Sequence, residues 1–164
     1  MKGKILLFTA ILTAAAIAGC AAERKAVKPD KVAEDFDKTA EISLNGRDYT
    51  ARLRRGGDEM WECEFTRPDC IAGFKLTTDR TGCLMTYNDM EYLADNSDLP
   101  QYALMPMLTA ALDEVIAGRN ISCTEGKNCL TEVGQAAGQS FKASVKNGEI
   151  TELEIAGQLT AKFT

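Results

Sequence analysis

The chain has 164 residues, the length of a single domain, and 45% of them are hydrophobic while 26% are charged. This composition is too apolar for a disordered chain, so one packed core is expected. Histidine is absent, which excludes Ser-His-acid and Cys-His nucleophile pairs and histidine-based metal sites. The 19 basic and 24 acidic residues give a net charge of −5, which argues against a nucleic-acid partner, since phosphate binding needs clustered positive charge.

The amino terminus has the pattern of an export signal. Lys2 and Lys4 precede an apolar run over residues 5–17, which is too short to span a bilayer comfortably. The run ends in Ile17-Ala18-Gly19-Cys20, which resembles the lipobox of bacterial lipoproteins. The resemblance implies a signal peptide over residues 1–19, acyl chains such as palmitate on Cys20, and a protein anchored at the bacterial cell membrane or envelope, facing away from the cytoplasm. The alternative is an uncleaved amino-terminal anchor in which Cys20 is incidental.

Residues 20–33 are predicted to be a lipidated flexible tether, followed by a single domain over residues 34–164. The segment 21–31 is polar, lacks apolar periodicity and contains Pro29. Its basic residues lie beside the expected anchor, where each one either gains about 1 kcal/mol from anionic headgroups or serves only solubility. These residues are Arg24, Lys25, Lys28 and Lys31.

From Phe36 onward apolar and polar residues alternate, which predicts antiparallel strands with one buried face. Asn45-Gly46 separates two alternating runs, and this dipeptide is the strongest short-range signal for a hairpin. Further turns are expected at 56–57, 68–69, 79–82 and 88–89, so about six strands precede residue 98. Four or five more follow residue 118, with a second hairpin at Asn147-Gly148.

Between residues 98 and 118 the apolar period changes to that of a helix. The stripe comprises Leu104, Leu108, Leu112 and Ile116. Ser97 or Asp98 is expected to cap the helix, Pro100 to lie in its first turn and Gly118 to end it. Pro106 lacks an N–H and is predicted to kink or split the helix.

The predicted fold class is α+β, with a strongly curved antiparallel sheet of roughly ten strands wrapped around one main helix. The strand bearing Trp61 runs into Arg67-Pro68-Asp69, and it is followed by the segment 71–74, a hairpin ending at 87–92 and a helix opening at Leu99-Pro100. This order resembles the bacterial lipoprotein-carrier (Lol-type) superfamily, whose members are half-open β-barrels lined with apolar side chains. The resemblance implies a cavity for acyl chains or another apolar ligand, and no site residue is transferred from it.

An apolar lining between sheet and helix would come from five large side chains, together with methionines that adapt to lipid. The five candidates are Trp61, Phe74, Met85, Leu108 and Leu112. The same side chains can fill an ordinary core. A ligand cavity and a filled core therefore both remain open.

Five cysteines follow Cys20. Cys123 and Cys129 flank a polar loop, and their spacing allows a disulfide that closes a short hairpin. At most one further bridge can form among the other three, which are Cys63, Cys70 and Cys83. Neither the C-x6-C nor the C-x5-C spacing is that of a zinc site, and no histidine is present to activate a thiol, so we expect no metal and no cofactor.

Acidic residues gather before the helix, where two carboxylates could serve as acid and base or bind calcium. The favoured interpretation is that they are solvated turn residues and a helix cap. The residues are Asp89, Glu91, Asp95 and Asp98. On neighbouring strands we also expect solvent-facing opposite charges, from Arg52, Arg54, Arg55, Glu62 and Glu64.

Three function hypotheses follow. The leading one is a non-enzymatic, membrane-anchored lipoprotein that binds or carries lipid or another apolar ligand. The second is a structural or protein-interaction module of the cell envelope with a filled core. The third is an enzyme that uses carboxylates.

Overall fold

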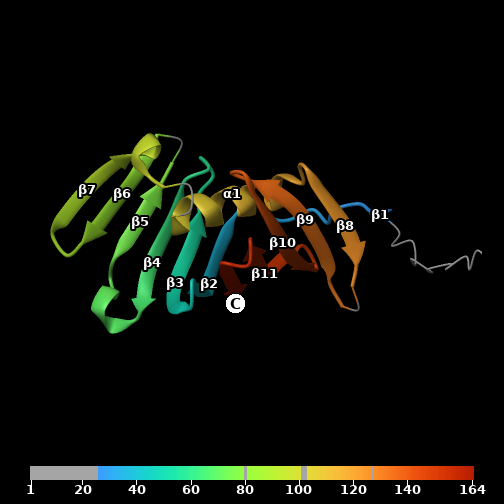
Figure 1. Cartoon of the computed structure of the whole chain (residues 1–164), viewed down its shortest axis with the longest axis horizontal. Helices are drawn as coiled ribbons and strands as arrows, with labels where there is room; N and C mark the ends of the chain where they lie inside the picture. Colours follow the sequence, from blue (N-terminus) through green and yellow to red (C-terminus); the bar gives the residue numbers. More distant parts are fainter. Residues whose placement is uncertain (1–25, 80, 101–102, 127) are drawn as a thin grey trace, which may run out of the picture.

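The structure is a computed structural model that describes residues 26–79, 81–100, 103–126 and 128–164. The predicted signal peptide and Cys20 lie outside these ranges. The described residues form twelve strands, two short 3-10 helices and one α-helix (Figure 1). In chain order they are β1 (Ala26–Val27), β2 (Phe36–Leu44), β3 (Arg47–Arg55), β4 (Trp61–Arg67), η1 (Asp69–Ile71), β5 (Lys75–Thr78), β6 (Gly82–Tyr87), β7 (Met90–Asp95), η2 (Asn96–Asp98), α1 (Leu104–Ala117), β8 (Ile121–Glu125), β9 (Leu130–Ala136), β10 (Gln139–Lys146), β11 (Glu149–Ile155) and β12 (Leu159–Phe163).

All twelve strands belong to one open sheet, in the order β1-β8-β9-β10-β11-β12-β2-β3-β4-β5-β6-β7. Strands β2–β7 form one half of the sheet, and α1 follows them in the chain. Strands β8–β12, with β1 at their edge, form the other half, and the two halves are joined where β12 pairs with β2. An antiparallel sheet with one main helix, as predicted, is therefore confirmed. Its two edges are β1 and β7. The sequence pattern missed β1 because two residues are too few to show alternation.

The two predicted Asn-Gly hairpins are confirmed. Leu44 pairs with Arg47 across Asn45 and Gly46, whose φ angles are 51° and 77°. Two successive positive φ angles define the turn that suits the right-handed twist of strands, and Asn and Gly adopt them at least cost. The second hairpin joins β10 to β11 at Asn147-Gly148, where Lys146 pairs with Glu149.

Helix α1 begins later than the sequence pattern predicted. It starts at Leu104, so Pro106 lies in its first turn, where a backbone N–H has no partner within the helix. The predicted kink at Pro106 is therefore wrong, because the proline occupies a position where its missing N–H costs nothing. The predicted end is confirmed: Gly118 has a φ of 61° and its N–H donates to the carbonyl of Val115.

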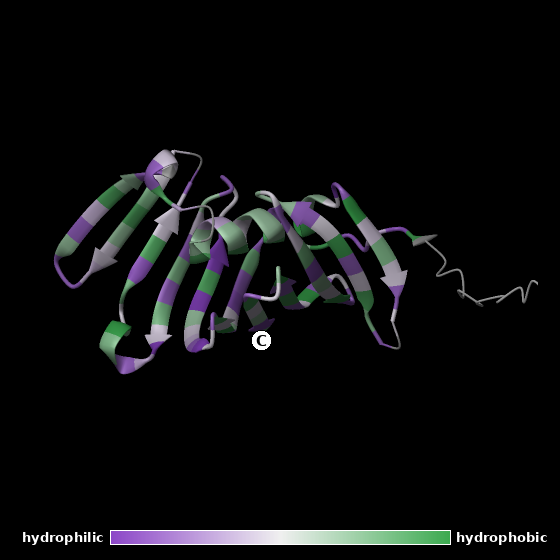
Figure 2. Ribbon diagram, viewed as in Figure 1, coloured by the Kyte–Doolittle hydropathy of each residue, from purple (hydrophilic) through white to green (hydrophobic). Residues whose placement is uncertain are grey.

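The core lies between α1 and the inner face of the sheet. Buried and exposed residues alternate along the strands, which gives the alternating bands of hydropathy in Figure 2. On β10, for example, Phe141, Ala143 and Val145 are buried. The helix adds six buried side chains, which are Met105, Met107, Leu108, Ala111, Leu112 and Val115. It packs mainly against β9, β10 and β11, so the middle of the sheet is covered and its β7 end is not.

The ordered fold reaches into the segment predicted as a tether. Val27 in β1 pairs with Cys123 in β8, and Val32 is buried with 4% of its surface exposed. The carbonyl of Lys31 lies against Gly148 in the β10–β11 turn. Residues 26–33 thus form a strap, which begins at the β1 edge and leads into β2. Within the described ranges, no helix has the length and hydropathy needed to cross a bilayer.

Candidate functional site

Strands β5, β6 and β7 form a wing that extends beyond α1 (Figure 1). Their inner face continues the core face, because Cys63 of β4 pairs with Leu76, Leu76 with Met85, and Met85 with Tyr92. A groove of about 630 Å³ lies on this part of the sheet, a size within the range of small-molecule sites. We call it the wing groove; it is lined by Phe74, Met85, Tyr87, Met90, Glu91 and Tyr92.

The wing groove is apolar and joined to the core. Its Phe74 ring stacks on Phe65 of the core at a centroid distance of 6.1 Å and meets Tyr87 edge-on at 6.2 Å. Among large hydrophobic side chains of the described ranges, the three most exposed are all in β7: Met90 at 65%, Tyr92 at 66% and Leu93 at 67%. Met90 and Tyr92 line the groove, and exposed apolar side chains that lie together in this way typically mark a binding surface.

The structure does not bring the five predicted lining residues to one place. Phe74 and Met85 line the wing groove. Trp61, Leu108 and Leu112 instead belong to the packed core, with at most 2% of their surface exposed. They are separated because α1 packs on the middle of the sheet, where its leucines fill the space that a ligand would need.

Trp61 ties the sheet to the helix through Asp113. The Trp61 indole N–H and the Arg55 Nε each donate to Asp113 Oδ1, at 3.1 Å and 3.0 Å. Burial raises the pKa of Asp113 above its usual value, although both hydrogen bonds oppose this rise. Arg55 therefore faces the helix, so the prediction that it lies on the solvent-facing side of the sheet is wrong. Arg54 does face outward, where it pairs with Glu62.

A second buried polar pair lies near the β1 edge. Glu132 of β9 is fully buried, and the Cys123 thiol donates to its Oε1 at 3.8 Å, whereas its Oε2 has no hydrogen-bond partner among the described residues. Burial raises the pKa of Glu132 to about 7, with a further contribution from Asp30. Burial and the neighbouring Glu132 also raise the pKa of the Cys123 thiol, to about 11. Such a thiol is a poor nucleophile at neutral pH, so the pair has no activated sulfur.

The disulfide that the sequence allowed between Cys123 and Cys129 is not formed, and both thiols are free. The strand register explains this, because Cys123 pairs with Glu132 while the Cys129 carbonyl accepts from the N–H of Gly126. Cys63, Cys70 and Cys83 are also free. Strand β5 separates Cys63 on β4 from Cys83 on β6. In the part of the chain that the structure describes, no three acidic or thiol side chains are placed to hold a metal ion.

The acidic residues before the helix do not converge. Glu91 and Asp95 are four residues apart on β7, which places their Cα atoms about 13 Å apart. Asp89 lies in the β6–β7 turn, and Asp98 ends η2 without acting as the cap of α1, which is Ala103.

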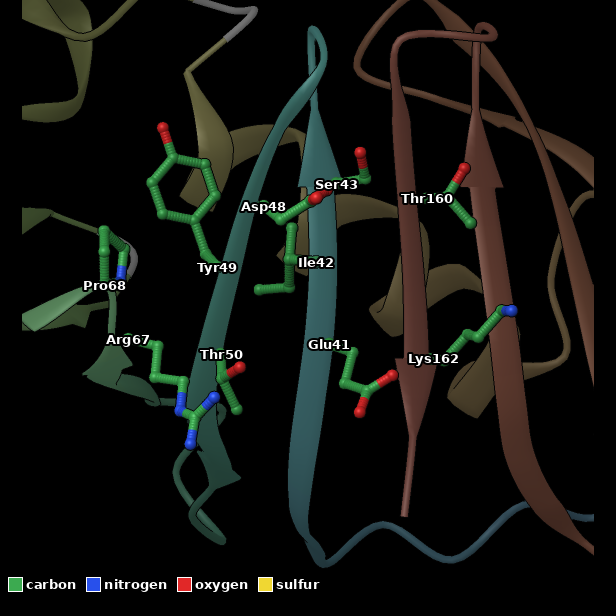
Figure 3. Close-up of a pocket in the computed structure, with 10 residues that line it drawn as sticks. All are labelled: Glu41, Ile42, Ser43, Asp48, Tyr49, Thr50, Arg67, Pro68, Thr160 and Lys162. Carbon is green, nitrogen blue, oxygen red and sulfur yellow. The ribbon is translucent and has the colours of Figure 1, made fainter.

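A second groove, of about 600 Å³, lies over β12, β2 and β3 and the end of β4 (Figure 3). Lys162 pairs with Glu41, Glu41 with Thr50 and Thr50 with Arg67. Figure 3 shows Glu41 between the two cations, although none of the ion pairs among the described residues includes these three charged side chains. Mixed charge of this kind is typical of the solvent face of an antiparallel sheet. The wing groove is therefore the better candidate site.

Comparison with protein-family models gave no match, and a search of curated proteins gave none either. The functional assignment consequently depends on the residues and their geometry.

Proposed function

We propose that the protein is a non-enzymatic bacterial lipoprotein, anchored at the cell envelope through acyl chains on Cys20, whose wing groove binds an apolar ligand such as a lipid. In this proposal the sheet and α1 act as a half-open barrel of the lipoprotein-carrier kind, with its open part at β5–β7. The observation that carries the proposal is the apolar wing groove, which continues the core face beyond the reach of α1.

The lining of the groove supports an apolar ligand over a polar one. Phe74, Met85, Tyr87, Met90 and Tyr92 supply aromatic and thioether surface, and Glu91 is its one charged lining residue. Methionine side chains adapt to ligands of varied shape, which suits acyl chains. Burying such surface stabilises a complex by about 25 cal/mol per Å² before the cost of association.

The β7 strand offers a matched pair of variants that tests the groove. Tyr92 faces the groove, while Leu93 points to the opposite face of the same strand, and the two are equally exposed. A dansyl-labelled fatty acid, whose emission rises on leaving water, reports binding. We expect Tyr92→Glu to weaken binding about tenfold or more, because the new carboxylate is desolvated by the ligand. The control Leu93→Glu should bind like the parent, and equal loss in both variants would contradict the groove.

The anchor is tested separately by fractionation. Cys20→Ser should release the protein into the soluble fraction or leave it unprocessed, because serine offers no thiol for acylation. A variant that is cleaved and still remains with the membrane would refute the lipid anchor. This result would leave the groove assignment untouched.

The second candidate function is a protein-interaction module with a filled core. It is favoured by one observation, the dense packing of Leu108 and Leu112 against the sheet. In this case the fatty acid should give no saturable signal with the parent protein.

A further inference from the structure

The exposed side chains of β7 lie on both faces of the sheet. Tyr92 pairs with Met85 and faces the wing groove, whereas Leu93 pairs with Leu84 and points to the opposite side. Met90 and Tyr92 are about as exposed as Leu93. A ligand in the groove covers only the inner face, so it leaves Leu93 in water. Only an occupant that lies along the edge of the strand covers both faces together.

Among the described residues, no strand pairs with the outer edge of β7, which is the last strand of the sheet. Tyr87 pairs with Met90 across a two-residue turn, so these two residues exchange the closing hydrogen bonds of the hairpin. Because bonding direction alternates along a strand, Tyr92 also bonds toward β6, while Glu91 and Leu93 direct their N–H and C=O groups outward. The edge is therefore a template for one more strand.

The charge of the edge identifies the kind of strand that fits. Residues 81–98 contain no lysine or arginine and four acidic residues. Suppose that the β7 strands of two copies of this chain pair antiparallel. If Leu93 of one copy lies opposite Leu93 of the other, then Glu91 lies opposite Asp95. Shifting the register so that Glu91 faces Leu93 puts Asp89 opposite Asp95. Like charges that face each other across strands are destabilising, so the edge disfavours a second copy of this chain and favours a basic partner.

We propose that β7 is a docking edge for an extended segment of a partner protein in which apolar and basic residues alternate. The segment adds antiparallel to β7, with main-chain hydrogen bonds to Glu91 and Leu93. Its apolar side chains extend the inner face beside Met90 and Tyr92. Its lysines or arginines lie on the outer face, near Glu91 and Asp95, where their aliphatic stems cover Leu93.

The experiment uses the full chain in phosphatidylcholine nanodiscs, with empty nanodiscs as the blank. The probe is a fluorescent seven-residue peptide that alternates lysine and valine, and its binding is followed by anisotropy. We expect saturable binding that weakens about tenfold or more when glutamate replaces lysine in the peptide, since charge complementarity is lost. Equal binding of both peptides would overturn the proposal.

Backbone pairing is tested by two variants at one position. Leu93→Pro removes the outward N–H, which β6 does not use, and proline is tolerated at such edge positions. Leu93→Thr removes the apolar side chain but keeps the N–H. We expect Leu93→Pro to weaken peptide binding about tenfold or more and Leu93→Thr to change it less than about threefold. Unchanged binding by Leu93→Pro overturns the proposal.

Two N-methylated peptides test strand addition on the unaltered protein, so the test does not depend on whether Leu93→Pro folds. One peptide carries N-methyl groups on its valines and the other on its lysines, so each blocks one of the two edges of the added strand. Only one of them should lose binding to the unaltered protein, because only alternate amides face β7. Equal binding of both peptides overturns strand addition. So does a dimer of this chain that Leu93→Pro dissociates, because the occupant is then a second copy.

The outcome is independent of the proposed lipid site. Tyr92→Glu tests the groove with the fatty acid, whereas Leu93→Pro leaves the inner face in place and should take up the fatty acid like the parent. Loss of peptide binding alone therefore locates the partner at the edge, and loss of fatty-acid binding alone concerns the groove.

Discussion

The fully buried carboxyl of Glu132 makes stability depend on pH in a way that a single substitution removes. Its pKa rises from a usual value of 4.5 to about 7 in the folded protein. Well below pH 4.5 the carboxyl is neutral in both the folded and the unfolded chain, so it does not make stability depend on pH there. As the pH rises from 4.5 to 7, the unfolded chain ionises first, so the free energy of unfolding falls.

The size of this loss follows from the two pKa values. Each pKa unit corresponds to about 1.4 kcal/mol, so the ionised carboxylate lowers stability by up to roughly 3 kcal/mol above pH 7. Glu132→Gln keeps the shape of the side chain and an oxygen that accepts from the Cys123 thiol, but it cannot ionise. The amide N–H groups of the variant add a cost that does not depend on pH, so we expect the stability of the variant relative to the parent to rise by up to roughly 3 kcal/mol between pH 4.5 and 8.

The assay is urea unfolding between pH 4.5 and 8, followed by the fluorescence of Trp61, the single tryptophan. The control is Glu154→Gln on β11, an exposed position, which should keep the pH profile of the parent. Asp113 also has a raised pKa, but it contributes equally to the parent and to both variants. A constant difference between parent and Glu132→Gln across this pH range would refute the reasoning.

Three further predictions concern packing, each measured as a urea unfolding free energy. Leu112→Ala should cost about 2 to 5 kcal/mol, the range for a packed leucine, and a loss below about 0.5 kcal/mol would show that this position is not in a filled core. Gly134→Ala should cost about 1 to 3 kcal/mol, because its Cβ would lie 2.7 Å from Phe141 Cζ, and a neutral effect would mean that the ring moves aside. Asp113→Ala should cost about 1 to 3 kcal/mol by leaving the buried Trp61 indole without its acceptor, and Trp61→Phe should recover part of that loss in the double variant.

Local signals predicted most of the fold because they act within a few residues. The Asn45-Gly46 turn and the Gly118 helix end need positive φ angles that these residue types supply, so their positions follow from the sequence. The start of α1 did not follow, because Ser97, Asp98 and Pro100 are residue types that suit a helix start, whereas the helix begins at Leu104 after Ala103. Arg55 was misplaced because its alternation places it beside Trp61 on the inner face, where Asp113 of the helix neutralises it.

The candidate site was predicted only in part. Phe74 and Met85 were expected to line a cavity between sheet and helix, whereas the structure places them in the wing groove, beyond α1. Tyr92 and Leu93 were missed, because their exposure arises from how far α1 reaches along the sheet, which is a tertiary property. The environment of Glu132 was missed for the same reason. An isolated acidic residue in an alternating run gives no sign that its side of the strand is buried in the folded protein.

The strap and the wing lie at opposite edges of the sheet, and this sets the distance along the sheet between the proposed membrane anchor and β7. Ala26 follows Cys20 by six positions in the sequence, which is at most about 22 Å of extended chain. With Cys20 in the membrane, as proposed, the β1 edge stays within that distance of the headgroups. Strand β7 lies eleven strand intervals away, about 50 Å along the sheet at 4.8 Å each. The sheet is therefore long enough to hold its β7 edge, the proposed docking edge, about 50 Å along the sheet from the anchored edge.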